Sequence, residues 1–163
     1  SQCELMEFGL EEGCTMEELP QKMNQVLPAG IVIHDCYEGG LPFRGLSFVR
    51  YDISLEFDGN LAQAAGEAFQ ELVSRDHFIV QKRSKKSKRG FTEVDLIPLI
   101  EGVETVQAQG DTLSLTLLLQ AQNPGLSPSV LLQGFQTADP SFVPVYSSCH
   151  RREILDQEKN VYR

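Results

Sequence analysis

The sequence predicts an α+β fold: a ferredoxin-like antiparallel sheet with helices on one face, preceded by a strand–helix–strand half unit. Residues 47–57 alternate between apolar and polar side chains, which is typical of a half-buried strand. Residues 103–108 and 112–120 alternate on either side of a Gly-Asp turn, as the two strands of a hairpin do. Apolar residues at helical spacing in 61–73 and after Ser127 supply two helices.

The remaining elements complete the order of the fold. We expect a short strand at 77–81, an irregular turn at 94–100 and a last strand at 142–149. With one middle strand set aside as an insertion, the order is strand, helix, strand, strand, helix, strand, which is that of the split β-α-β unit. Residues 151–163 are mostly charged, and the pattern leaves open whether they extend the last strand, form a short helix or are disordered.

The first 37 residues read as half of another such unit. Alternation predicts strands at 4–10 and 31–37, and Thr15 opens a helix between them. A Gly- and Pro-rich connection over 38–45 is the expected boundary. The predicted organisation is therefore given by these parts: 1–38 as a truncated half unit, 47–150 as the ferredoxin-like domain with a basic insertion at 82–90, and 151–163 as a charged tail.

Residues 82–90 form the most basic stretch of the chain. They hold six of its 14 Lys and Arg residues, so the other 8 stand against 23 Asp and Glu, a formal charge of −15. A basic run on an acidic body is typical of a local phosphate contact, and we expect RNA as its partner. The predicted nucleic-acid-binding residues are Lys82, Arg83, Lys85, Lys86, Lys88, Arg89 and Phe91. Alternatively, the same run is a solvated hairpin tip that binds nothing.

Composition limits the other classes of function. No apolar run is long enough to span a membrane, and no signal peptide opens the chain, so we expect a cytoplasmic protein with four reduced cysteines. His34 with Cys36, and Cys149 with His150, are soft pairs of the kind that bind zinc. Adjacent strand residues point to opposite faces, so we expect no metal site.

Catalysis finds little support in the sequence. The chain has no nucleophile elbow and no phosphate-binding loop, and its carboxylates are scattered, so no catalytic residue is predicted. A small enzyme would need a cleft lined by carboxylates whose pKa is shifted. Asp95, inside an apolar segment, is expected to cap the turn that follows it; the alternative is an ion pair with a Lys or Arg of the basic run.

Four segments together resemble a known family. Residues 3–10 read CELMEFGL, residues 23–31 read MNQVLPAGI, residues 51–55 read YDISL, and the basic run leads to VDLIPL at 94–99. Their order and spacing are similar to those of the radical-SAM-linked uncharacterised domain family, and they cover the chain to about Ile100.

The resemblance implies the carboxy-terminal part of a radical SAM protein with a cobalamin-binding domain, or a stand-alone protein. The family's amino-terminal basic and aromatic segment and a C-x-x-x-C-x-x-C motif are not in this sequence, which starts Ser1-Gln2 without Met. We therefore expect a truncated fragment whose parent chain would hold the iron–sulfur cluster, SAM and cobalamin, with no cofactor in the fragment.

The expected function is a non-catalytic accessory domain that holds RNA through residues 82–90. Two alternatives stay open. One is a module that docks on the radical SAM catalytic domain without binding nucleic acid, which requires an exposed apolar patch near residues 3–37. The other is a small enzyme in its own right.

Overall fold

The structure, a computed structural model, divides into two compact units. It describes residues 3–10, 15–40, 42–83 (of Arg83 the backbone alone) and 90–162. The larger unit comprises Arg44–Tyr162 together with Cys3, and the smaller unit is Glu4–Phe43. The division falls within the Gly- and Pro-rich connection at 38–45.

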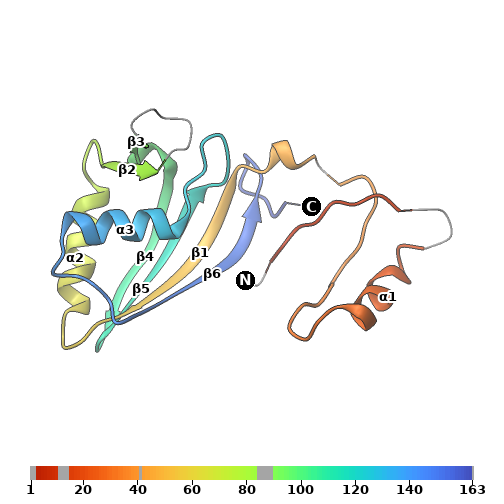
Figure 1. Cartoon of the computed structure of the whole chain (residues 1–163), viewed down its shortest axis with the longest axis horizontal. Coiled ribbons are helices and arrows are strands. Elements are labelled where there is room, and N and C mark those ends of the chain that lie inside the picture. Colours follow the sequence, from red (N-terminus) through yellow and green to blue (C-terminus); the bar gives the residue numbers. More distant parts are fainter. Residues whose placement is uncertain (1–2, 11–14, 41, 84–89, 163) are drawn as a thin grey trace. The chain divides into compact units, whose positions relative to one another are not determined.

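The larger unit is built on a four-stranded antiparallel sheet. Its strands lie in the order β4 (Ile100–Gln109), β5 (Thr112–Gln120), β1 (Phe48–Glu56) and β6 (Tyr146–Leu155). Helices α2 (Ala62–Val73) and α3 (Pro128–Ala138) lie together on one face of the sheet (Figure 1). The predicted α+β class is confirmed, and the order of elements and strands is consistent with the ferredoxin-like arrangement.

The core lies between that face and the two helices. The register pairs Ile53 of β1 with Leu115 of β5, and Leu55 with Leu113, and all four side chains are buried. Phe69 of α2 is also buried and meets the ring of Phe135 of α3 edge to face, with the ring centroids 5.6 Å apart. Burial of alternate residues on the central strands is what their sequence pattern predicts.

A second sheet of two strands is inserted between α2 and β4. Strands β2 (Ile79–Arg83) and β3 (Phe91–Asp95) pair antiparallel, and a 3-10 turn, η2 (Ile97–Leu99), follows them. The helix α3 packs closely against this hairpin at Gly134, where an added Cβ would lie 2.8 Å from Val80 Cγ1 and 3.0 Å from Phe78 Cζ. The hairpin is therefore anchored in the core on one face.

The last strand begins later and ends later than predicted. β6 pairs along the whole of β1, from Tyr146 opposite Glu56 to Leu155 opposite Phe48. Of the alternatives left open for residues 151–163, strand extension is the one found for 151–155. Beyond it the chain turns back, and Tyr162 is buried with its ring against Gly45.

The smaller unit holds helix α1 (Leu19–Val26), and its first turn begins at Thr15, whose hydroxyl accepts the N–H of Glu18 at 3.4 Å. A one-turn 3-10 segment, η1 (Phe43–Gly45), follows the unit. The strands predicted at 4–10 and 31–37 are wrong: neither segment is paired as a strand in the described residues. The backbone groups of Ile33 form hydrogen bonds with a side chain in place of a neighbouring strand. The side chain of Asn24 accepts the N–H of Ile33 at 2.7 Å and donates to the carbonyl of Ile33 at 2.9 Å.

Candidate binding surfaces

The open end of the β2–β3 hairpin carries the predicted nucleic-acid contact. The register places Lys82 opposite Thr92 and Arg83 opposite Phe91, so Lys82 and Phe91 lie on opposite faces of the hairpin. The side chains of Lys82 and Phe91 are both exposed. The other predicted contacts fall outside the described residues: Lys85, Lys86, Lys88, Arg89 and the side chain of Arg83. Among the described residues, a ligand that touched both Lys82 and Phe91 would have to reach around the end of the hairpin.

The base of the same hairpin is held by Asp95. Its carboxylate accepts the Nδ1–H of His77 at 2.7 Å and the backbone N–H groups of Phe78 at 2.9 Å and Ile97 at 3.2 Å. These hydrogen bonds, that of His77 foremost, hold the pKa of Asp95 below its ordinary value. Asp95 thus caps the η2 turn as expected by accepting the N–H of Ile97, and its side-chain partner among the described residues is His77. No sequence pattern pointed to His77, which precedes β2 and meets Asp95 at the base of the folded hairpin.

The smaller unit leaves most of its apolar side chains in contact with solvent. Among its described residues, Leu19 is the one buried apolar side chain. Val26 is 82% exposed and Met6 is 62% exposed. The exposed large apolar residues of this unit are Met6, Phe8, Leu10, Val26, Ile31, Val32, Tyr37 and Phe43. Large exposed apolar patches are typical of surfaces that contact other molecules.

The same unit is strongly acidic. Residues 4–43 contain eight Asp and Glu residues and one basic residue, Lys22, a formal charge of −7. Lys22 donates to Glu18 at 2.8 Å, and this hydrogen bond lowers the pKa of Glu18. A partner for this unit therefore has to offer apolar side chains together with basic ones.

The soft residues weighed as metal ligands are divided between the two units. Cys149 lies in β6 of the larger unit, where burial raises the pKa of its thiol, and His34 and Cys36 lie in the smaller unit. In the part of the chain that the structure describes, no three His, Cys, Asp or Glu side chains gather as a metal site would require. Within the same part, no helix is long and apolar enough to cross a membrane.

Comparison with known proteins identifies a family for most of the chain. Residues 1–128, which extend as far as the first residue of α3, match the model of a family described as "Uncharacterized protein conserved in bacteria (DUF2344)". No curated protein and no solved structure matches the chain.

Proposed function

Since this chain belongs to the DUF2344 family of bacterial proteins, whose description names no activity, we propose a non-catalytic accessory domain that docks through residues 4–43. The partner we propose is the catalytic domain of a radical-SAM-type protein. The choice of partner is supported by the four segments, at 3–10, 23–31, 51–55 and 94–99, that resemble the radical-SAM-linked family. The docking itself is supported by the exposed apolar side chains of the smaller unit.

The exposed apolar side chains are the main support for the proposal, because leaving them in water is less favourable in free energy than burying them. Fully burying a side chain such as Val, Leu or Phe stabilises by about 1.5–3 kcal/mol relative to leaving it in water. Eight large apolar side chains are exposed in the smaller unit, and among its described residues Leu19 is the one that is buried. A stable interface needs roughly 1,000 Å² of buried surface with an apolar centre, and this unit supplies apolar side chains for such a centre.

The acidic residues of the unit decide what surrounds that centre. With a formal charge of −7 over residues 4–43, the rim of the interface is negative. Opposite charges at an interface raise the rate of association and exclude partners of the wrong sign. The proposed face on the catalytic domain is thus apolar with a basic rim, and its binding weakens as salt concentration rises.

Titration calorimetry between this chain and the catalytic domain tests the proposal. Phe8→Ser and Val26→Ser each weaken binding about tenfold, because each removes an apolar contact that the partner buries. Val145→Ser, at a position 70% exposed in the larger unit, is the matched control and leaves binding unchanged. Absence of binding, or equal losses in all three variants, contradicts docking through the smaller unit.

A second function, contact with RNA at the β2–β3 hairpin, is favoured by a separate observation. The hairpin is anchored by Phe78 and Val80 against α3. It exposes Lys82, the first residue of the basic stretch 82–90, and Phe91, which follows that stretch in the sequence. Lys and Arg contact phosphates, and an exposed aromatic ring stacks on an unpaired base. The two proposed functions use different parts of the chain and can both hold.

Single-stranded RNA retention as a function of salt tests this second function. Each phosphate contact contributes a slope of about −0.7 to the plot of log affinity against log salt concentration. Lys82→Gln reduces that slope, whereas Lys22→Gln, which changes charge equally in the smaller unit, leaves it unchanged. Retention that is insensitive to salt and to Lys82→Gln contradicts the RNA contact.

A further inference from the structure

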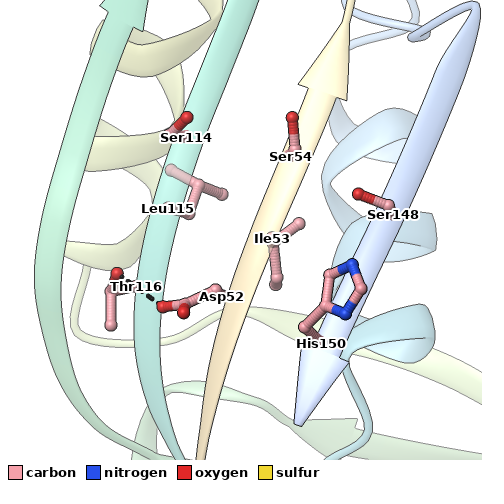
Figure 2. A pocket seen from close by; sticks show the side chains of 8 residues that line it. All are labelled: Asp52, Ile53, Ser54, Ser114, Leu115, Thr116, Ser148 and His150. Atoms are coloured by element: carbon pink, nitrogen blue, oxygen red, sulfur yellow. Dashed lines mark hydrogen bonds between the residues drawn. The ribbon is translucent and has the colours of Figure 1, made fainter. Parts of the chain in front are cut away.

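The sheet face opposite α2 and α3 carries a shallow hollow of about 270 Å³. Figure 2 shows the side chains that line it, which come from β5, β1 and β6. The register sets these residues in two rows across the three strands, Ser114–Ser54–Ser148 and Thr116–Asp52–His150. Neighbouring strands lie about 5 Å apart and the rows about 7 Å apart, so the six side chains form a grid the size of a small ring-shaped molecule.

Asp52 is the charged centre of this grid. Its Oδ1 accepts the hydroxyl of Thr116 at 3.0 Å, and its Oδ2 lies 3.6 Å from Nη1 of Arg152. Arg152 is the extra residue where β6 shifts register against β1, and a bulge of this kind redirects a side chain. Asp52 is still 44% exposed, so its carboxylate has room to accept hydrogen bonds from a ligand.

Longer side chains form the next row on this face, two residues before Asp52 along β1. Arg50 of β1 crosses the sheet, donating to Glu104 of β4 at 2.9–3.0 Å and to Glu153 of β6. The bond to Glu104, in particular, raises the pKa of Arg50, so the guanidinium stays charged and the three side chains stay joined. The hollow forms where the side chains are short. These are Ser114, Ser54 and Ser148, whereas the side chains in the rows on this face that include Asp52 and Arg50 are longer.

Charge and shape narrow the class of ligand. Asp52, Glu56, Glu104 and Glu153 place four carboxylates on this face against the two guanidinium groups of Arg50 and Arg152, and this excess of negative charge disfavours a phosphate or another anion. Among the described residues that line the hollow, the imidazole of His150 is the one aromatic ring, and they offer no larger ring on which a base would stack. The Ser hydroxyls both donate and accept, and Asp52 accepts, which suits a neutral ligand that carries hydroxyl groups of its own.

We propose that this hollow binds a neutral ligand through a pair of adjacent hydroxyl groups, a vicinal diol. One hydroxyl donates to Asp52 and its neighbour exchanges hydrogen bonds with Ser54 and Ser148. The volume, at the low end for ligand sites, fits one sugar ring. Two sources share this chemistry, a free sugar and the ribose of a nucleoside. The site is independent of the docking surface and of the hairpin, since none of its residues belongs to either.

A titration followed by amide NMR on the whole chain tests the proposal. The probes are methyl ribofuranoside, adenosine, their 2′-deoxy forms, which lack the diol, and inorganic phosphate. Saturable shifts on β1, β5 and β6 around Asp52, with a dissociation constant on the order of 1 mM, are expected for the two ribo compounds. Equal affinities assign the diol to a free sugar, and at least fivefold tighter binding of adenosine assigns it to a nucleoside.

Variants separate the site from accidental contact. Asp52→Asn keeps the shape, loses the charged acceptor and weakens binding about tenfold. Ser148→Leu, on edge strand β6, fills the hollow and abolishes binding, while Glu71→Gln on α2 changes nothing. Three results overturn the proposal: no saturable shift at about 50 mM of either ribo compound, equal binding of the deoxy forms, or tighter binding of phosphate.

Discussion

Two segments of this chain share one sequence pattern and have different fates. Met6, Phe8 and Leu10 alternate with polar residues as Ile53, Leu55 and Phe57 do. The second set is buried between the sheet and its helices, whereas the first is 42–62% exposed. Alternation shows which face of a segment is apolar. A strand also needs neighbouring strands whose backbone groups form hydrogen bonds with its own N–H and C=O groups. The larger unit provides those neighbours within itself, whereas the described residues of the smaller unit leave Met6, Phe8 and Leu10 exposed.

The largest expected difference between the two units is in stability. Leu115→Ala leaves a cavity in the closed core and destabilises the larger unit by about 2–5 kcal/mol. Phe8→Ala removes a 43% exposed side chain and changes stability by at most about 0.5 kcal/mol. Urea unfolding followed by circular dichroism measures both, and equal destabilisation would mean that residues 4–10 are packed as a core strand.

A smaller loss is expected where α3 meets the hairpin. Gly134→Val places methyl groups against Val80 and Phe78, whose atoms lie within 3.0 Å of the added Cβ, and destabilises by about 1–3 kcal/mol through overpacking. Gly59→Ala is not a suitable control, because Gly59 has a positive φ of 80°. Ser129→Ala on α3, exposed, is the control and should leave the urea midpoint unchanged.

The smaller unit is expected to respond locally. Asn24→Ala removes two hydrogen bonds to the backbone of Ile33, which contribute about 1 kcal/mol on the net scale of such bonds. Amide exchange at Ile33 should rise about fivefold while exchange in β1 and β5 stays as it was. A rise that also appears in the sheet would show that the two units unfold together.

The smallest effect is the pH dependence carried by Asp95. Its pKa in the folded chain lies below the ordinary value of 3.8, so its stabilisation is complete well above that pH and is lost as the pH falls through the folded pKa. Asp95→Asn therefore lowers the urea midpoint at pH 7, and the gap from the parent chain closes below about pH 4. A gap that stays constant from pH 7 to about pH 2 would contradict the role of the charged form. Asp76→Asn, an exposed neighbour, is the control.

Periodicity predicted most of the larger unit, and pairing explains what it missed. The elements that were predicted are β1, the β4–β5 hairpin, α2 and α3. Each buries one apolar face, so its apolar residues recur at the period of a strand or a helix, and that period can be recognised in the sequence. β6 continues through charged residues because it pairs with β1 along the whole length of β1. This pairing cannot be predicted from the local sequence of β6. At 31–37 the pattern predicted a strand, but Asn24 holds the backbone groups of Ile33.

The candidate sites could be predicted from the sequence only where their residues are close together in the chain. The basic run can be recognised in the sequence because its residues are consecutive, and the docking alternative required exposed apolar residues near 3–37, where Met6, Phe8 and Val26 are exposed. The pairing of His77 with Asp95 and the grid around Asp52 were not predicted. The members of the grid come from strands that are distant in sequence, such as those of Ser114 and His150, and the sheet register places them together. His77 precedes β2 and meets Asp95 only once the hairpin has folded.

Hydrogen–deuterium exchange with and without the radical-SAM-type catalytic domain tests the central claim most directly. Docking through the smaller unit predicts slower exchange at residues 4–10 and 31–37 when the partner is present, with exchange in β1 and β5 unchanged. A complex that forms without added protection in those two segments would contradict the claim.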